Sequence, residues 1–238
     1  QIKTMVDYVN RNREGFNQMR EFKLEENISP SNSFNLPYSQ NVNYDFQFQI
    51  IKTELPKHDY EIAYLSIQEL AYLIKNKILS SERLTRIYID RIKQFDKKLN
   101  SVVNLIEEVA IEQSIRADNE IERGIYRGIL HGIPYGIKDI ASYPNYPTTW
   151  GTEPYKDRII NEKAEVIKKL ENAGAVMIAK LSSGSLARGD TWYNGKTKNP
   201  WDLNQGSSGS SAGSASATSA GLVAFSIGTE TLGSIISP

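Results

Sequence analysis

The chain has 238 residues, which is enough for one large domain or two small ones, and its 28 Lys and Arg balance its 28 Asp and Glu. This balance excludes the basic surface with which nucleic-acid-binding proteins neutralise phosphates, and it leaves no polybasic cluster for an anionic membrane. Cysteine is absent and histidine occurs only at His58 and His131, so a thiolate metal site, a Cys nucleophile and a three-His zinc site are excluded. No apolar run approaches the roughly 18 residues of a membrane span. The composition therefore predicts a protein with an ordinary core, without metal or cofactor, and indicates no particular compartment.

Residues 1–60 differ from the rest of the chain because they are rich in Asn and Gln. Apolar residues recur at helical spacing near the start, and a turn-rich passage with prolines follows. Alternation at Phe46, Phe48 and Ile50 indicates an edge strand. We expect this segment to be a polar N-terminal arm on a domain that covers residues 61–238.

Helical and strand-like patterns alternate in that domain. Ser66 and Glu69 have the spacing of a capping box, which predicts a helix to about Lys77. Ser81 is expected to cap a second helix with one apolar face. The later pattern predicts a strand over residues 102–106, a polar helix over 108–123, a helix from about 161 and a strand over 175–179. Helices that alternate with short β-rich runs favour an α/β layer fold.

Residues 206–220 consist only of Gly, Ser, Ala and Thr. This composition is typical of a flexible linker, but a run that looks like a buried strand follows at residues 222–227. The second half of the segment, residues 212–220, is compatible with a helix that packs close against a sheet. A Gly-rich turn that opens a helix also gathers N–H donors around one point, which suits an anion or an oxyanion. No Lys follows the glycines, so the residues of a nucleotide-binding loop are missing.

Three separated segments resemble conserved blocks of the amidase signature family. Residues 208–214 (SGSSAGS) and 228–234 (GTETLGS) are similar to its two core blocks, and residues 131–139 (HGIPYGIKD) to its upstream lysine block. Residues 199–202 (NPWD) also match. The resemblance covers residues 61–238 and implies a three-layer α/β/α sandwich with a mixed β-sheet. Because the family's domain continues well beyond its nucleophile, we expect the chain to be the N-terminal part of a longer protein.

The resemblance implies an amidohydrolase that cleaves a carboxylic amide through an acyl-enzyme. Ser234 would be the nucleophile, Ser210 the bridging serine and Lys138 the base of a Ser-Ser-Lys triad. A serine hydroxyl needs an adjacent base, and a lysine can accept its proton only if burial lowers the lysine pKa from its reference of about 10.4. The apolar residues 133–140 around Lys138 predict such burial.

The resemblance also assigns supporting groups. Gly209 and Ser211 would support the loop of the bridging serine, next to a cis peptide bond in which glycine is well tolerated. Asp139 would orient its loop, while His58 and His131 are expected to be structural. Backbone N–H groups of the oxyanion hole would come from Thr231, Leu232, Gly233 and Ser234.

Several positions depart from the family's usual residues. Leu232 replaces the first glycine of a Gly-Gly-Ser sequence, Glu230 stands where Asp is common, and Ile236 stands where Arg is common. Residues 180–185 replace a block that often carries Asn and Glu. Since Leu does not easily adopt φ > 0, we expect the oxyanion loop to sit differently.

Two alternatives to a stand-alone amidohydrolase therefore stay open. One is the amidase (A) subunit of a tRNA-dependent amidotransferase, which would need partner subunits and is the one case that involves nucleic acid. The other is a catalytically silent binding protein that has kept the fold. The expected partner in the leading interpretation is a small-molecule amide substrate, and a homo-oligomer stays open.

Overall fold

The computed structural model describes residues 2–21 and 49–238. The chain divides into two units, Gln1–Phe46 and Gln47–Pro238. None of the described helices combines the length and the apolar character needed to cross a lipid bilayer.

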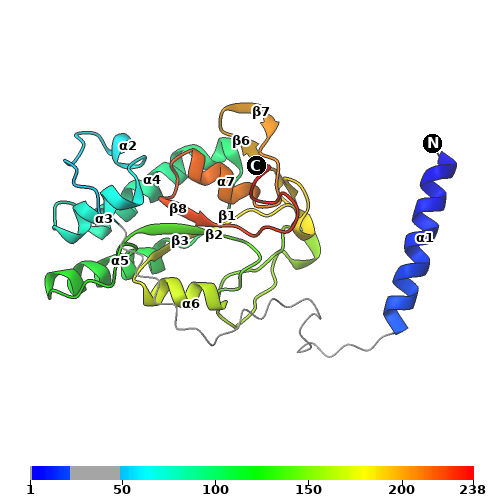
Figure 1. Cartoon of the computed structure of the whole chain (residues 1–238), viewed down its shortest axis with the longest axis horizontal. Helices are drawn as coiled ribbons and strands as arrows, with labels where there is room; N and C mark the ends of the chain where they lie inside the picture. The colour runs from blue at the N-terminus through cyan, green and yellow to red at the C-terminus, as the bar shows by residue number, and fades with distance from the viewer. Residues whose placement is uncertain (1, 22–48) are drawn as a thin grey trace. The chain divides into compact units, whose positions relative to one another are not determined.

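The first unit contains the helix α1 (Ile2–Glu21), shown in blue in Figure 1. It confirms the helical spacing at the start of the sequence. The turn-rich passage, Phe46 and Phe48 lie outside the described residues, and Ile50 is not part of a strand.

Three helices open the second unit: α2 (Asp59–Ile62), α3 (Ile67–Lys75) and α4 (Ser81–Leu99). The capping box predicted at the start of α3 is confirmed. The Ser66 hydroxyl accepts a hydrogen bond from the Glu69 N–H at 3.3 Å, and the Glu69 carboxylate accepts one from the Ser66 N–H at 2.8 Å. Two backbone donors that no helical carbonyl can reach are thereby satisfied.

The cap of α4 is Ser80, and the prediction of Ser81 was wrong. The Ser80 backbone is extended and its hydroxyl accepts a hydrogen bond from the Arg83 N–H at 3.1 Å, as a capping residue requires. Ser81 is already helical, and its buried hydroxyl donates to the Gly132 carbonyl at 2.7 Å. This bond ties the start of α4 to the turn that leads into the central sheet.

The central sheet has four strands in the order β1-β3-β2-β8. β1 runs antiparallel to β3, whereas β3, β2 and β8 are parallel, so the sheet is mixed. Its strands are β1 (Val102–Leu105), β2 (Pro134–Lys138), β3 (Val176–Leu181) and β8 (Phe225–Ile227). Two small hairpins pair β4 (Thr191–Trp192) with β5 (Gly195–Lys196) and β6 (Lys198–Asn199) with β7 (Asp202–Gly206). The other helices are α5 (Glu107–Glu122), α6 (Glu165–Asn172), α7 (Ala212–Ser219) and the 3₁₀ turns Glu153–Tyr155 and Ser185–Ala187.

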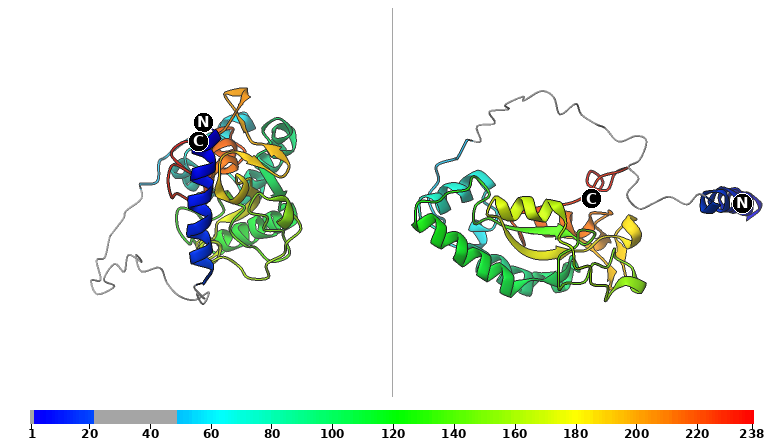
Figure 2. Two further views of the ribbon diagram at one scale, coloured as in Figure 1. Left: turned by 90° about the vertical axis from the view of Figure 1, so that its right-hand side faces the viewer. Right: turned by 90° about the horizontal axis from the view of Figure 1, so that it is seen from below.

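Helices cover both faces of this sheet. Figure 1 shows α4 and α7 on one side and α6 on the other, and the view from below in Figure 2 (right) looks on the α6 side. The predicted three-layer α/β architecture is therefore confirmed. Within the small-residue segment, α7 is a helix packed on the sheet, so this part of the segment is not a linker.

Two predicted elements begin later than expected. α6 starts at Glu165 instead of residue 161, because Ala164 has an extended backbone and donates its N–H to the Ser142 carbonyl at 2.9 Å. The strand predicted from residue 222 starts at Phe225, because Leu222 is buried in the turn after α7 and donates its N–H to Ala217.

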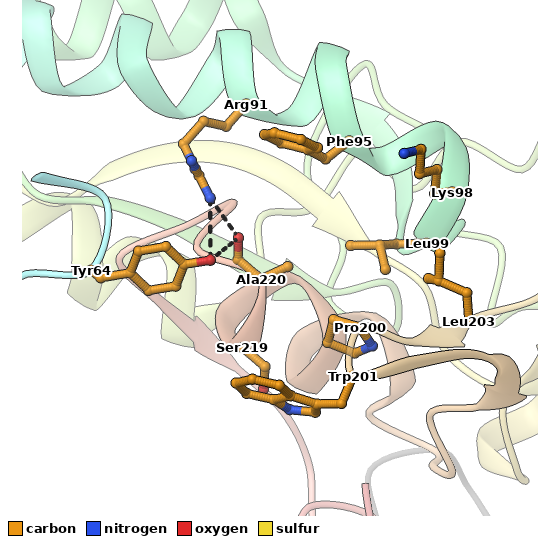
Figure 3. A pocket seen from close by; sticks show the side chains of 10 residues that line it. All are labelled: Tyr64, Arg91, Phe95, Lys98, Leu99, Pro200, Trp201, Leu203, Ser219 and Ala220. Carbon is orange, nitrogen blue, oxygen red and sulfur yellow. Dashed lines mark hydrogen bonds between the residues drawn. The ribbon is translucent and has the colours of Figure 1, made fainter. Parts of the chain in front are cut away.

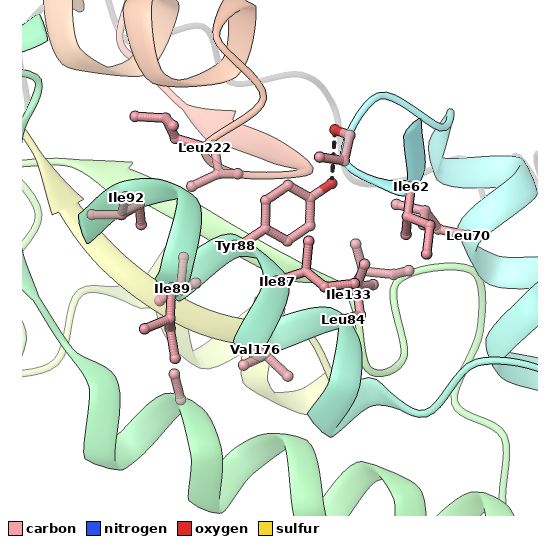
Figure 4. Packing of buried hydrophobic residues seen from close by; sticks show 14 of the residues in the cluster. Ile62, Leu70, Leu84, Ile87, Tyr88, Ile89, Ile92, Ile133, Val176 and Leu222 are labelled. Carbon is pink, nitrogen blue, oxygen red and sulfur yellow. Dashed lines mark hydrogen bonds between the residues drawn. The ribbon is translucent and has the colours of Figure 1, made fainter. Parts of the chain in front are cut away.

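The larger apolar core lies between α4, α7 and the sheet (Figure 4). Tyr88 of α4 is fully buried there and donates its hydroxyl to the Ala63 carbonyl at 3.2 Å, which satisfies the polar end of the ring. A second core on the α6 side contains Tyr135, Ile137 and Ile167. Side chains alternate along a strand. Because Tyr135 and Ile137 face the α6 side, Lys138 faces the α7 side.

Candidate active site

The end of β2 and the start of α7 place the predicted site residues next to each other. Lys138 is the last residue of β2 and is 1% exposed, as its apolar neighbours predicted. Ser210 and Ser211 immediately precede α7. The helix can approach this closely because a Cβ on Gly213 would lie 2.3 Å from the Ser182 backbone nitrogen, so only glycine fits.

Three side chains form a continuous polar chain. The Lys138 Nζ lies 2.7 Å from the Ser210 Oγ, and the Ser210 Oγ lies 3.2 Å from the Ser234 Oγ. Lys138 and Ser210 are each 1% exposed, whereas Ser234 is half-buried. These hydrogen bonds thus connect a buried amine to a hydroxyl that solvent can reach.

Lys138 has two further hydroxyl partners. Its Nζ lies 3.2 Å from the Ser211 Oγ and 2.9 Å from the Thr229 Oγ1. Burial lowers the pKa of Lys138 from 10.5 to about 8, although the negative charge of Glu230 raises it. A neutral amine at this place can donate to Ser211 and Thr229 and accept the proton of Ser210, which is the state that a base needs.

Thr229 is the site residue that sequence reasoning missed. It stands at the start of the second core block, but its type and spacing carry no signal that its hydroxyl meets Lys138. The contact arises because β8 runs parallel to β2 and delivers residues 228–229 beside the end of that strand.

Gly209 and Ser211 flank Ser210, the expected bridging serine. The peptide bond between Gly209 and Ser210 is cis. A Cβ on Gly209 would lie 2.1 Å from the Gly189 carbonyl oxygen, so the two backbones are in direct contact. The Ser211 N–H donates to the Ser234 carbonyl at 3.0 Å, and this bond joins the bridging loop to the loop of the candidate nucleophile.

The loop of Ser234 is organised around Glu230. The N–H groups of Gly233 and Ser234 both donate to the Glu230 carboxylate, at 3.0 Å for Ser234. The N–H groups of Thr231 and Leu232 bond to no described residue. Two of the four expected oxyanion donors are therefore occupied by a carboxylate of the same loop.

Leu232 does not need the strained conformation that its position suggested. The positive φ of this loop lies at Gly233, at 97°, and the Leu232 side chain is 96% exposed. Glycine at position 233 is thus the residue that permits the turn.

Asp139 contacts the loop after β2, and Lys180 of β3 pairs with it. Both are fully buried, and the Lys180 Nζ lies 2.7 Å from the Asp139 Oδ1. The same Nζ donates to the Thr148 hydroxyl at 2.8 Å, and the other Asp139 oxygen accepts the Thr149 N–H at 3.0 Å. This buried pair fixes the loop on the α6 side of the sheet, opposite Lys138.

Replacing Lys180 by Met is expected to destabilise the protein by about 3–5 kcal/mol, because the Asp139 carboxylate would then be buried without its counter-charge. Urea denaturation followed by circular dichroism measures the change. The control is Lys93→Met, which breaks the exposed pair with Glu107 and should cost at most about 1 kcal/mol. Equal effects of the two variants would contradict a structural role of the buried pair.

The contacts of the two histidines lie outside the cluster of Lys138, Ser210 and Ser234. His131 is fully buried, accepts the Arg127 N–H on Nδ1 at 3.1 Å and lies 3.0 Å from the Glu120 carboxylate through Nε2. Burial lowers the pKa of His131. His58 precedes α2 and stacks on Tyr60.

An apolar cleft of about 280 Å³ lies away from these residues (Figure 3). Arg91 crosses one end of it and donates to the Ala220 carbonyl at 2.9 Å and to the Tyr64 hydroxyl at 3.3 Å. Trp201 forms another wall and is 84% exposed. The cleft contains none of the predicted site residues.

The model of the family described as "Amidase" matches residues 83–238, which is more than half of the chain. The chain belongs to the amidase signature family. The expected family and fold are thereby confirmed.

Relatives within the amidase family include two bacterial proteins, each named as the A subunit of glutamyl-tRNA(Gln) amidotransferase. The protein of Caldanaerobacter subterraneus subsp. tengcongensis is 36% identical over 181 residues, which cover 75% of this chain and 37% of that protein. The protein of Coxiella burnetii is 38% identical over 176 residues, which cover 73% of this chain and 36% of that protein. The chain thus spans little more than a third of the length of these relatives.

Solved structures of amidase enzymes share the fold. The peptide amidase of Stenotrophomonas maltophilia matches with a TM-score of 0.70 and 31% identity over 74% of this chain and 38% of its own. A fatty acid amide hydrolase matches with a TM-score of 0.70 and 29% identity over 76% of this chain and 32% of its own. The mixed sheet and its helices therefore correspond to part of a larger amidase fold.

Proposed function

We propose that this protein hydrolyses a carboxylic amide through an acyl-enzyme on Ser234. The observation that carries the proposal is the continuous contact from Lys138 through Ser210 to Ser234. A hydroxyl alone is a weak nucleophile, and here its proton has a path to a buried amine whose pKa lies near 8.

The direction of the hydrogen bonds follows the charge of Lys138. As an ammonium ion it donates to all three hydroxyls, and Ser210 then donates to Ser234. As a neutral amine it accepts the Ser210 proton, so Ser210 can accept the proton of Ser234. The neutral state is therefore the one in which Ser234 can attack.

The reaction balances with these groups alone. The Ser234 Oγ bonds to the amide carbon, while its proton moves to Ser210 and the Ser210 proton moves to Lys138. The C–N bond then breaks, and the amine leaves with a proton returned from Lys138 through Ser210. Water then bonds to the acyl carbon and gives one proton to Lys138 through Ser210. The bond between this carbon and the Ser234 Oγ breaks, the acid leaves, and Lys138 returns the proton through Ser210 to Ser234.

An active-site label tests the proposal directly. The natively produced protein that contains this chain is incubated with a fluorophosphonate, its intact mass is measured, and the adduct is located by peptide mapping. We expect one adduct, on Ser234, together with ammonia release from at least one primary amide in a panel of peptide, aliphatic and aromatic amides. An adduct on another residue, or none, would contradict the proposal.

A second candidate is supported by the names of the amidotransferase relatives: the A subunit of an enzyme that amidates glutamyl-tRNA(Gln). The same acyl-enzyme would form, but the released nitrogen would pass to the tRNA-bound glutamate. Amide nitrogen labelled with ¹⁵N separates the two functions. Hydrolysis yields labelled ammonia without other proteins, whereas the amidotransferase yields labelled glutaminyl-tRNA only when further subunits are added.

Replacing Thr229 by Val should slow the labelling of Ser234 about 3- to 10-fold, the equivalent of one ordinary hydrogen bond. The variant keeps the shape of the side chain and removes the acceptor that holds the Lys138 Nζ at 2.9 Å. The measurement is the second-order rate constant for fluorophosphonate labelling. Thr229→Ser retains the hydroxyl and should restore the rate; equally slow labelling in Thr229→Ser would argue against the hydrogen bond.

A further inference from the structure

Four consecutive backbone N–H groups point at the carboxylate of Glu230. One carboxylate oxygen accepts from Gly233 and from Ser234, the latter at 3.0 Å. The other accepts from Ile235 at 2.6 Å and from Ile236 at 3.3 Å. The loop thus wraps an anion that is supplied by its own side chain.

This arrangement opposes catalysis at Ser234, because the carboxylate occupies two of the four expected oxyanion donors, the N–H groups of Gly233 and Ser234. Attack on an amide carbonyl creates an oxyanion beside the nucleophile, and backbone N–H groups must be free to bind it. The N–H of Ser234 itself is bonded to Glu230. A carboxylate on these donors both occupies them and repels a second negative charge.

We propose that Glu230 holds the site in a resting state: its carboxylate occupies the N–H groups of Gly233 and Ser234 and must leave them before all four expected donors can polarise an amide carbonyl. The inference rests on the proposed function and adds that a residue of the same loop inhibits Ser234. Removing the carboxylate should therefore accelerate the chemistry of Ser234.

The charge of Glu230 opposes catalysis in a second way. It raises the pKa of Lys138, which burial lowers, and so favours the protonated form that cannot act as a base. The groups that face the Lys138 Nζ from the neighbouring segments are the hydroxyls of Ser210, Ser211 and Thr229. The carboxylate of Asp139, the next residue, pairs with Lys180 on the other side of the sheet.

Glu230 lies at the surface. It is exposed, and the contacts of its carboxylate are with backbone N–H groups of the same loop. Displacement of the side chain into water therefore breaks no apolar packing. A substrate that enters with its carbonyl oxygen can compete for the same donors.

The test compares Glu230→Ala and Glu230→Gln with the wild-type chain in fluorophosphonate labelling of Ser234 across pH. We expect Glu230→Ala to be labelled about tenfold faster or more, since a single oxyanion donor is worth 10²–10³ in kcat. The pH midpoint of its labelling should also fall below the wild-type value, because the charge acting on Lys138 is gone. Glu230→Gln keeps one acceptor oxygen and should be intermediate. Glu165→Gln, an exposed glutamate on α6, is the matched control and should change neither quantity.

A second measurement separates this inference from the proposed function. Amide resonances of residues 233–236 should follow the titration of the Glu230 carboxyl in ¹H–¹⁵N spectra and lose this dependence in Glu230→Gln. Labelling of wild-type Ser234 that is as fast as, or faster than, that of Glu230→Ala would overturn the resting-state role and leave the serine chemistry intact. If the amides follow Glu230 but Ser234 is labelled in no variant, the proposed function fails and the resting-state role fails with it.

Discussion

Replacing Ser234 by Ala is expected to abolish the fluorophosphonate adduct and to lower amide turnover on the order of 10⁴-fold or more. The Ser234 hydroxyl is the accessible end of the path from Lys138. Ser210 cannot replace it, because its hydroxyl is 1% exposed and lies against the Lys138 Nζ. Ser211 cannot replace it either, because its hydroxyl donates to the Thr229 carbonyl at 3.1 Å.

Intact mass and peptide mapping measure the adduct, and ammonia release measures turnover. The matched control is Ser237→Ala, in the same loop, where an exposed hydroxyl donates to the Gly209 carbonyl. This control should keep both the adduct and the activity. An adduct that persists in Ser234→Ala would assign the nucleophile to another residue. Turnover that survives without an adduct would point to hydrolysis without an acyl-enzyme.

Replacing Lys138 by Met should lower the labelling rate of Ser234 by roughly 10³- to 10⁵-fold and remove its pH dependence, since an essential member of a catalytic unit is lost. Met keeps the apolar length of the side chain inside the core but has no amine. Ser210 then has no acceptor for its proton, and the Ser234 hydroxyl stays a weak nucleophile.

The wild-type pH profile shows whether the labelling rate rises or falls when Lys138 loses its proton. Neutral Lys138 is the active form, so labelling should be slow at low pH and should rise as pH increases through about 8. Lys138→Arg is the second variant, because its guanidinium keeps the positive charge but does not release a proton in this range. It should be as slow as Lys138→Met; rapid labelling in Lys138→Arg would show that charge, and not proton transfer, is what Lys138 supplies.

Local patterns predicted much of this structure from the sequence. The S-x-x-E spacing at Ser66 predicted its capping box, because both partners lie within one helical turn. The apolar neighbours of Lys138 predicted its burial for a similar reason: a run of apolar residues at the centre of a sheet is covered on both faces. The resemblance to the amidase signature family implied that Lys138, Ser210 and Ser234 belong to one site, and their side chains are in contact.

Predictions that depended on neighbours distant in the chain were less accurate. Two adjacent serines stand at the start of α4. Ser80 is the cap, while the helical Ser81 bonds to Gly132, 51 residues further along the chain. The start of β8 was placed too early because Leu222 is as apolar as a strand residue, although it packs in a turn. In both cases the residue type is compatible with two local structures: a cap or a helical residue for Ser81, and a strand or a turn for Leu222. Contacts with distant residues select one of them.

By itself the sequence indicated the order of helices and strands, because these follow from local patterns along the chain. Its resemblance to the amidase signature family indicated the family and proposed the three residues of the candidate relay. The tertiary structure alone decided how the loop of Ser234 is held. Parallel pairing of β8 with β2 brings Thr229 to Lys138, and a turn at Gly233 directs four N–H groups to the Glu230 carboxylate. A hydrogen bond depends on the distance between donor and acceptor, to a few tenths of an ångström, and on the angle between them. A pattern of residues along the chain does not specify these distances and angles.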